Sequence, residues 1–329
     1  MNILVLGGTA WLSRQIAAEA LSRGHDVTCA ARGESGPVAD GARLVTVDRD
    51  DPDALAELAE QEWEAVIDVT RRPSHARAAV AALADAAEHW TYISSVSVYA
   101  DHATPHQDVS APTLEPAPSD VDETDTSRYG ELKRACEVAV TDALPDRSLV
   151  VRPGLVVGPG DPSGRFAYWP HHAAAAAELL VPGSPEDNVQ LIDVRDLAAW
   201  VVTLAEDDVV GVLDGVGPPV SREQFVQEVL VGVDTSPALV WVEDEFLAEH
   251  GVQMWMGERS IPLWAPGPGY AGHMARDVLL SVDADLLVRP LSETARDTLL
   301  WLRENPDATV AGLTDTEHAE LVAAAHRRT

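Results

Sequence analysis

The sequence predicts an α/β fold in which helices cover both faces of a doubly wound parallel sheet. Over the first 155 residues, short apolar runs rich in β-branched residues alternate with longer amphipathic segments, a pattern typical of alternating strands and helices. A glycine-containing turn directly follows the first strand, as in Rossmann-type nucleotide-binding folds. The strands are expected at residues 2–6, 26–31, 43–47, 65–69, 91–94 and 149–152.

The ends of the first helices carry recognisable signals. The helix of residues 13–23 stops at Gly24, because glycine readily adopts the backbone conformation that ends a helix. Asp51 is suited to be an N-cap and Pro52 to be the first helical residue, so a helix is expected to begin there. Further helices are expected over residues 73–88, 128–142, 194–206, 221–230 and 292–305.

The regular alternation fades after residue 153 into Gly- and Pro-rich stretches broken by helices. A chain of 329 residues is also long for one ordinary domain. We therefore predict a Rossmann-type NAD(P)-binding domain over residues 1–157, to which the chain returns at about 188–215. A smaller α+β substrate-binding domain would comprise residues 158–187 and 216–329.

The charge balance argues against two classes of partner. With 54 acidic and 23 basic residues the formal net charge is -31, which would repel nucleic acid and anionic membranes. The first strand begins at residue 2 with no signal peptide before it, and no apolar run is long enough to span a bilayer. The 2 cysteines form no disulfide framework, so we expect a cytoplasmic protein.

The turn after the first strand indicates a dinucleotide site. Its sequence runs from Gly7 to Arg14 and leads into a helix, whose N-terminus would bind a pyrophosphate. Ala10 and Ser13 stand where the usual motif has glycines, so a structural turn without a ligand is the alternative. The expected cofactor contacts here are Gly7, Thr9, Ala10, Trp11 and Leu12.

The residues that follow the second and third strands bear on the choice of cofactor. The second strand ends in Ala30-Ala31-Arg32-Gly33, with no acid in these four positions to accept from the ribose hydroxyls of NAD, whereas Arg32 offers donors suited to the 2'-phosphate of NADP. We therefore expect NADP(H), with NAD(H) possible, although Arg32 would also suit an exposed loop. Asp48 could accept from the adenine amino group or simply be a solvated strand-end carboxylate.

Tyr129 and Lys133 are the strongest catalytic signal. They lie four residues apart on one predicted helix and therefore share a face, and Lys133 is the one lysine of the chain. A tyrosine beside an ammonium group can serve as general acid or base for a carbonyl or hydroxyl group. Lys133 would stabilise the phenolate and hold the cofactor ribose.

Ser95 follows the fifth strand at the carboxyl edge of the sheet, where such folds bind ligands. Its hydroxyl could donate to the reacting oxygen. Ser94 and Ser97 compete for this role, and a hydroxyl that only caps the strand end is the other possibility.

Together these features resemble the extended short-chain dehydrogenase/reductase superfamily, which includes the NAD-dependent epimerases and dehydratases. The resemblance rests on the Gly7 turn, the Ser94–Tyr99 segment, the Tyr129–Lys133 motif, Arg152-Pro153-Gly154 and residues 190–196. It implies that Ser95, Tyr129 and Lys133 are the catalytic trio. It also implies cofactor contacts from Thr70, Pro153, Leu155 and Val156.

Residues 158–170 resemble a bacterial reductase-like subgroup whose substrates are mostly unassigned. A sugar-nucleotide dehydratase would have an Asp-Glu pair where Val96 and Ser97 stand, which disfavours that reaction. Aromatic residues suit an apolar or ring-bearing substrate, although a tryptophan in a small domain is also typical of a core. The candidate substrate contacts are Ser97, Arg165, Tyr168 and Trp169.

We expect no metal site. Pro105 separates His102 from His106, and the neighbours His171 and His172 on a helix point in different directions. The predicted function is NADP(H)-dependent reduction of a carbonyl group, or the reverse oxidation, on a small organic substrate. The alternatives are an NAD-dependent nucleotide-sugar epimerase and a non-catalytic NAD(P)-binding protein. The resemblance also implies that a homodimer could form through helices 73–88 and 128–142.

Overall fold

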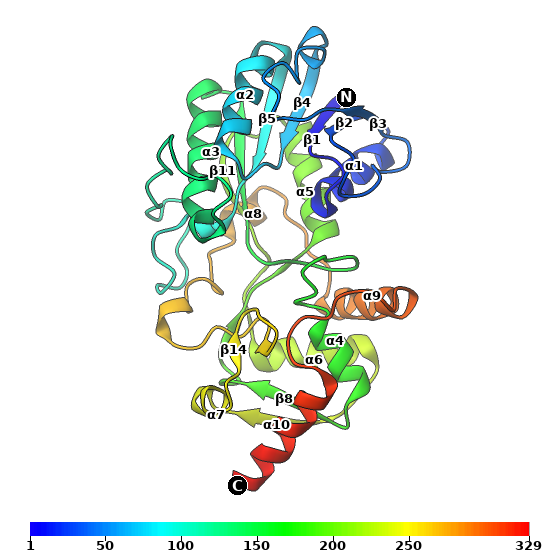
Figure 1. Cartoon of the computed structure of the whole chain (residues 1–329), viewed down its shortest axis with the longest axis vertical. Coiled ribbons are helices and arrows are strands. Elements are labelled where there is room, and N and C mark those ends of the chain that lie inside the picture. The colour runs from blue at the N-terminus through cyan, green and yellow to red at the C-terminus, as the bar shows by residue number, and fades with distance from the viewer. Residues whose placement is uncertain (329) are drawn as a thin grey trace.

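A seven-stranded parallel sheet forms the centre of the first domain in the computed structural model, which describes residues 1–328 (Figure 1). The strand order is β11-β6-β5-β4-β1-β2-β3, so the winding direction reverses between β1 and β4. This is the topology of a doubly wound Rossmann-type fold, and it confirms the predicted fold class. The strands are β1 (Asn2–Leu6), β2 (Asp26–Ala31), β3 (Arg43–Thr46), β4 (Trp63–Asp68), β5 (Ala87–Ile93), β6 (Ser148–Pro153) and β11 (Gly211–Gly215).

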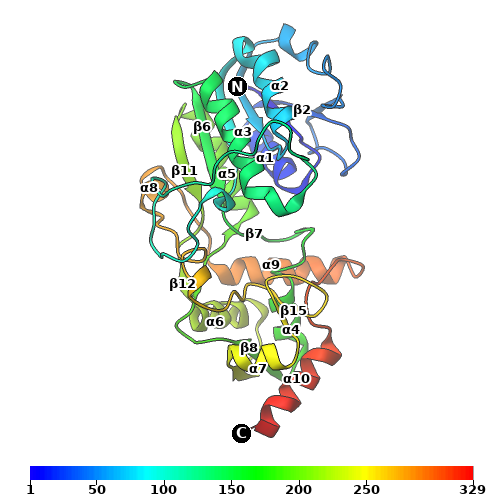
Figure 2. The same cartoon turned by 60° about the vertical axis from the view of Figure 1, so that its left-hand side comes forward.

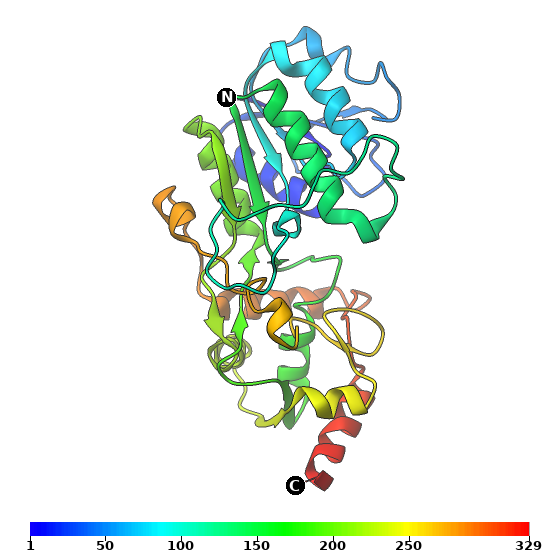
Figure 3. The ribbon, with the colours of Figure 1, turned by 90° about the vertical axis from the view of Figure 1, so that its left-hand side faces the viewer.

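Two layers of helices bury the sheet on both faces, as Figure 3 shows for one of them. Successive side chains of a strand point to opposite faces. Ile3 and Val5 therefore pack in the core formed with α1 and α5, whereas Leu4 packs in the core formed with α2 and α3. These helices are α1 (Trp11–Ser22), α2 (Pro73–Leu83), α3 (Tyr129–Ala143) and α5 (Val194–Glu206).

Two expectations about helices were wrong. No α-helix begins at Asp51. Its carboxylate accepts a hydrogen bond from the amide of Asp53 at 3.0 Å, but its carbonyl oxygen closes a tight turn with the amide of Ala54 at 3.2 Å, and only the 3-10 segment Leu58–Glu60 follows. The helix expected over residues 73–88 ends at Leu83. Ala87 already pairs with β4, so tertiary pairing overrides the helix propensity of the Ala-rich segment.

The second domain lies below the sheet in Figure 2, with the C-terminal helix α10 at its far end. Its core contains Phe166, Tyr168, Trp169 and Phe225, which are fully buried. Small two-stranded pairings and helices enclose this core. The elements are α4 (Tyr168–Ala175), β8 (Glu178–Pro182), β9 (Asn188–Val189), β12 (Val220–Ser221), α6 (Arg222–Val233), β13 (Ala238–Val242), α7 (Asp244–Glu249), β14 (Gln253–Met254), β15 (Ser260–Ile261), α9 (Leu291–Glu304) and α10 (Asp315–Arg328). The short strands β7 (Val156–Val157) and β10 (Ile192–Asp193) pair with each other, and α8 (Leu279–Asp283) packs against β11 of the sheet.

The α-helices of residues 1–328 are short: the longest, α3, has 15 residues. Within the described part of the chain, no helix combines the length and the apolar character needed to cross a membrane.

Candidate active site

Two cavities open at the carboxyl ends of the sheet strands. The first, of about 370 Å³, is bounded by the segments that follow β1, β2, β3 and β4. The second, of about 530 Å³, lies beside the ends of β5 and β6 and is closed by the second domain. Of the predicted site residues, Gly7, Thr9, Ala10, Arg32, Asp48 and Thr70 line the first cavity, and Ser95, Ser97, Tyr129, Leu155 and Arg165 line the second.

The turn after β1 forms one wall of the first cavity. Gly7 adopts φ +99°, and a Cβ atom built on it would meet no atom within 4 Å, so the turn leaves open space above this residue. Ser13 is fully buried, and its hydroxyl donates to the carbonyl oxygen of Gly7 at 2.5 Å. The serine that replaces a motif glycine therefore fixes the turn rather than obstructing it.

Helix α1 directs an uncapped N-terminus at the same cavity. The amide groups of the first turn of any helix lack intrahelical acceptors. The N-cap residue of α1, Ala10, makes no side-chain capping bond that would replace them. Free amide donors and the helix dipole favour an anion at this end. This end of α1 and the open space above Gly7 fit a dinucleotide pyrophosphate.

Trp11 and Leu12 do not line the cavity with their side chains. The Trp11 indole donates to the carbonyl oxygen of Pro159 at 3.0 Å, which ties the start of α1 to the segment that leads into the second domain. Any cofactor contact from Trp11 or Leu12 would therefore involve their backbone amides.

Arg32 lies on the rim of the first cavity, with 57% of its side chain exposed. Its Nε atom is 3.2 Å from Glu34 Oε2, and such an exposed ion pair contributes at most about 1 kcal/mol, so an anionic ligand could displace it. Exposed Arg71 lines the same cavity and has no ion-pair partner within residues 1–328. Exposed Asp48 accepts from the amide of Asp50 at 3.1 Å.

Helix α3 brings Tyr129 beside the end of β5. The helix approaches the chain closely at Gly130, where an added Cβ atom would lie 2.1 Å from the carbonyl oxygen of Ser97. Tyr129 and Ser95 thus face one cavity, and the Tyr129 hydroxyl has no hydrogen-bond partner among the described residues. Ser95 Oγ accepts from the amide of Ser97 at 3.1 Å and donates to Ser97 Oγ at 3.2 Å.

Lys133 is buried between the two cavities. Its Nζ atom donates to the carbonyl oxygens of Thr70 at 2.7 Å and Ile93 at 2.6 Å, and it lies 4.9 Å from the centre of the Tyr92 ring. These two carbonyls occupy two of the three ammonium protons, which leaves one for a ligand. Lys133 makes no hydrogen bond to Tyr129 in this structure. Its predicted roles, stabilising the Tyr129 phenolate and holding the cofactor ribose, stay predictions.

Ser94, one of the three candidate serines, belongs to a buried network behind the site. Its hydroxyl donates to Glu137 Oε1 at 2.5 Å, and Arg152 binds both oxygens of the same carboxylate at 2.9 Å. Arg152 also donates to the hydroxyl of Tyr99, which in turn donates to Asp214 at 2.7 Å. This network joins α3 to β6 and β11 and leaves Ser95 and Ser97 as the serines that face the cavity.

The wall of the second cavity opposite Tyr129 comes from the second domain. Arg165 lies 5.5 Å from the centre of the Trp255 ring and donates from Nε to Ser163 Oγ at 3.1 Å. Within residues 1–328 no carboxylate lies within ion-pair distance of this guanidinium, and the carboxylate of Asp161 interacts with it from farther away. Burial lowers the pKa of Arg165 from its ordinary value, so an anionic ligand would meet a poorly solvated cation. Met254, Met256, Ala265 and Tyr270 complete this wall.

His102 and His273 were not expected in the site. Both line the second cavity, with their Nδ1 atoms 3.4 Å apart, although 171 residues separate them in the sequence. Burial, followed by the neighbouring His102, lowers the pKa of His273 to about 4. From the sequence, we considered His102 only as a metal ligand together with His106, and no local pattern indicates its pairing with His273.

Two predicted substrate contacts require correction. Tyr168 and Trp169 are fully buried in the core of the second domain, and the Trp169 indole donates to the carbonyl oxygen of Pro262 at 3.1 Å. They are structural because α6 and the residues around Pro262 cover their rings. Pro153, which ends β6, and Val156, which pairs with Ile192, lie beside the cavity walls without lining either cavity.

The comparisons with known proteins agree with this geometry. The model of the NAD dependent epimerase/dehydratase family matches residues 3–213, and no curated protein matches the sequence significantly. Three similar solved structures are UDP-N-acetylglucosamine 4-epimerase from Bacillus cereus (TM-score 0.67, 14% identity, covering 92% of this chain and 99% of that chain), UDP-glucose-4-epimerase from Stenotrophomonas maltophila with bound NAD and formylated UDP-arabinopyranose (0.65, 20%, 94% and 100%), and the Bordetella bronchiseptica enzyme WbmH in complex with NAD+ (0.64, 16%, 92% and 98%).

Proposed function

The chain belongs to the NAD dependent epimerase/dehydratase family, and from this premise we propose that it is an epimerase acting on a hydroxyl-bearing ring of an anionic substrate. The observation that carries the proposal is the shared cavity of Tyr129, Ser95 and Arg165, which combines acid–base groups with a cation that forms no ion pair with a carboxylate among the described residues. The chosen reaction was the alternative in the sequence analysis. The similarity to nucleotide-sugar epimerases now favours it over carbonyl reduction.

In the proposed reaction the side chains of the protein move one proton to and from the substrate hydroxyl group. A dinucleotide held by the Gly7 turn and the start of α1 would supply reversible hydride transfer, which oxidises the substrate carbon and then reduces it from the opposite face. Tyr129 Oη would take the proton of the substrate hydroxyl as that carbon is oxidised and would give it back on reduction. Ser95 Oγ would donate to the same oxygen, and Lys133 would use its remaining proton to hold the cofactor.

The shape and lining of the second cavity support epimerisation. An epimerase must let the oxidised ring turn over before the hydride returns, which requires space and adaptable walls. The cavity has a volume of about 530 Å³ and includes Met254 and Met256, whose side chains adapt readily to different ligand shapes. Arg165 would hold the anionic part of the substrate while the ring turns.

The substrate class to test first is a nucleotide-linked sugar. Two of the similar structures are named as epimerases of UDP-linked sugars. In this chain Arg165 would bind a phosphate, and Trp255 or Tyr270 would pack against a ring. Arg195, another arginine of the region after β6, forms ion pairs with Asp193 and Asp297 at 2.7 and 2.6 Å, so the substrate would be held by fewer charges than a pyrophosphate site commonly offers.

A second candidate is an NADP(H)-dependent carbonyl reductase. Arg32 and Arg71 on the rim of the first cavity favour it, because two guanidinium groups without buried partners suit the 2'-phosphate of NADP. The family model names NAD, so the NADP preference stays a proposal. We propose that the binding partner is a small molecule and not nucleic acid or a membrane. We also propose that a second copy of the chain packs on α2 and α3.

The deciding experiment is to denature the purified protein, identify the released dinucleotide by mass spectrometry, and incubate native protein with a panel of UDP-sugars. Released NAD and epimer formation without added reductant support the epimerase, and Tyr129→Phe should remove that activity. Consumption of added NADPH by carbonyl compounds, with no retained dinucleotide, would favour the reductase. The third outcome is a protein that binds cofactor but converts no substrate. If cells with the Tyr129→Phe variant also keep the wild-type phenotype, the role of the protein is non-catalytic.

A further inference from the structure

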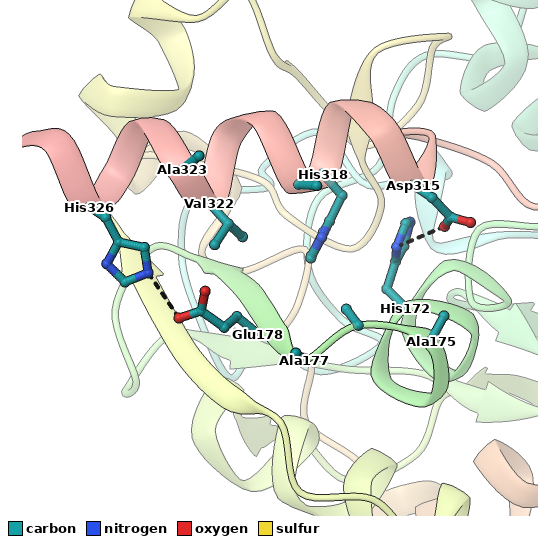
Figure 4. Close-up of a pocket in the computed structure, with 11 residues that line it drawn as sticks. His172, Ala175, Ala177, Glu178, Asp315, His318, Val322, Ala323 and His326 are labelled. Atoms are coloured by element: carbon teal, nitrogen blue, oxygen red, sulfur yellow. Dashed lines mark hydrogen bonds and ion pairs between the residues drawn. The ribbon is translucent and has the colours of Figure 1, made fainter.

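A histidine-rich pocket of about 430 Å³ lies between the end of α4, the start of β8 and α10 (Figure 4). None of the residues that line it contributes to either active-site cavity. Three histidines, His172, His318 and His326, face it together with Asp315 and Glu178, and His171 lies next to its edge. The proposed epimerase chemistry uses none of these groups.

At one end of the pocket, three side chains converge on a single point. His171 Nε2 lies 2.9 Å and His172 Nδ1 lies 3.5 Å from the same oxygen, Asp315 Oδ1. One ligand atom from each of the three residues lies within 4.8 Å of those of the other two. The corresponding spacing in a tetrahedral zinc site is roughly 3.3 Å, given zinc bonds of about 2.0 to 2.1 Å, so small side-chain movements would suffice.

The orientation of His172 is that of a metal ligand. Its Nε2 atom is 3.0 Å from the carbonyl oxygen of Leu313, which only accepts, so Nε2 carries the proton. The opposite nitrogen, Nδ1, then presents its lone pair to Asp315 in the neutral ring. The 3.5 Å separation is longer than an ordinary N–H···O hydrogen bond and is close to the roughly 3.3 Å between two ligand atoms of one zinc ion.

The surroundings hold His172 in this orientation. Its side chain is only 2% exposed, and the His318 ring stacks on it with centres 4.6 Å apart and planes 13° apart. His318 is itself fixed, because its Nε2 accepts from the amide of Leu180 at 3.1 Å. A hydrogen bond from the second ring nitrogen to a backbone carbonyl is the usual device that orients metal-binding histidines.

We propose that His171, His172 and Asp315 bind a divalent transition-metal ion of the zinc type. Two imidazoles and one carboxylate are a ligand set suited to Zn²⁺, and they give the site one negative charge. The fourth coordination position would open into the pocket and be filled by water. This inference is independent of the reaction proposed for the active site.

The proposal departs from the expectation of no metal site, which assumed that neighbouring helix residues cannot converge. The His171 and His172 rings do differ in direction, with an interplanar angle of 81°. They reach one carboxylate because His171 approaches it with Nε2 and His172 with Nδ1, and because α10 places Asp315 between them. Asp315 is far away in the sequence, so no local spacing reveals the set.

The consequence of the site would be to fasten the C-terminal helix. Asp315 is the first residue of α10, and both histidines belong to α4. The start of α10 is also set by Thr314, whose hydroxyl and amide pair with Glu317 at 2.9 Å. A metal ion bound to all three ligands would therefore lock α10 against α4 and stabilise the second domain.

The test uses the full chain, stripped with a chelator and titrated with ZnCl₂ by calorimetry. We expect one equivalent of zinc per chain, and Co²⁺ in its place should give the visible absorption of a tetrahedral site. His171→Gln and Asp315→Asn should each weaken zinc binding by roughly tenfold or more. Both side chains are partly or largely exposed, so these variants should fold.

His326→Gln is the matched control. His326 faces the same pocket but pairs with Glu178 at its other end, at 2.9 Å, so its loss should leave zinc affinity unchanged. The chain has a net charge of -31 and could gather zinc unspecifically. Equal affinity and stoichiometry in wild type, His171→Gln and Asp315→Asn would show such unspecific binding and overturn the proposal, as would the absence of zinc binding at submillimolar concentration.

Discussion

Lys133 Nζ donates a hydrogen bond to the carbonyl oxygen of Thr70 at 2.7 Å, although the two residues lie on different elements and 63 positions apart. The bond connects α3, which carries Tyr129, to the segment after β4 that lines the first cavity. A second bond, to Ile93, connects the same ammonium to the end of β5. The Lys133 side chain thus connects a wall of the first cavity to the helix and the strand end that border the second cavity.

Lys133→Met should therefore reduce both stability and turnover. Methionine keeps much of the length of lysine but donates no hydrogen bond, so the Ile93 carbonyl loses its side-chain donor and Thr70 retains only the Tyr92 hydroxyl. We expect the free energy of unfolding to fall by about 1–3 kcal/mol, measured by urea denaturation. Cofactor binding, followed by fluorescence, should weaken as well, and an unchanged cofactor affinity would contradict the position assigned to the third ammonium proton.

Ser13→Ala tests the altered glycine motif. The Ser13 hydroxyl donates to the Gly7 carbonyl at 2.5 Å, so its removal takes away one of the bonds that fix the turn. We expect a loss of about 1 kcal/mol in stability and a several-fold weaker affinity for the dinucleotide. Ser22→Ala, at the exposed end of the same helix, is the control, and it should leave cofactor affinity unchanged. Equal affinities in all three proteins would mean that the turn needs no such support.

The sequence predicted those parts of the fold and site that depend on local pattern. The bounds of β1 and β2 match, because apolar and β-branched runs between turn signals mark buried strands. Ser95 comes just after the end of β5 and Tyr129 is the first residue of α3, and the local pattern predicts both of these element ends. The two side chains face one cavity, as expected. The Asp51 signal was misleading, because a short acidic side chain serves a turn as well as a helix start.

The remaining features arise from contacts between distant segments. His102 meets His273 only because the segment after β5 packs against residues from the second domain. Aromatic character alone did not distinguish Trp255, which faces the cavity, from Trp169, which the α6 side chain Phe225 covers at a ring-centre distance of 5.1 Å. These outcomes depend on which neighbour covers each ring, and a single sequence does not carry that information.

Arg32→Glu tests the cofactor preference. Replacing the guanidinium by a carboxylate removes the donors proposed for a 2'-phosphate and adds a charge that repels it. We expect the affinity for NADPH to fall at least roughly tenfold while NADH binding is kept or improved, measured by parallel titrations. Arg43→Gln, which alters another exposed arginine at the start of β3 and outside the cavity, should change neither affinity. A wild-type protein that prefers NADH, with Arg32→Glu unchanged, would rule out the NADP assignment.

His273 should make the protein less stable in mild acid. Burial and His102 lower the pKa of His273 to about 4 in the folded state, against 6.5 for an ordinary histidine. Below pH 6.5 the unfolded chain therefore binds a proton that the folded chain excludes, so stability is full above this pH and is lost as the pH falls towards 4. At about pH 5 the loss from this residue should be roughly 2 kcal/mol relative to pH 8.

The measurement is urea denaturation of wild type and His273→Asn at both pH values. Asparagine is polar but does not titrate, so the variant should lose less stability between pH 8 and pH 5 than the wild type does. The difference at pH 8 reports any packing change, because both proteins have the same charge there. Identical pH dependence in the two proteins would show that His273 is solvated enough to accept a proton in the folded state, and that the second cavity is open to water at this wall.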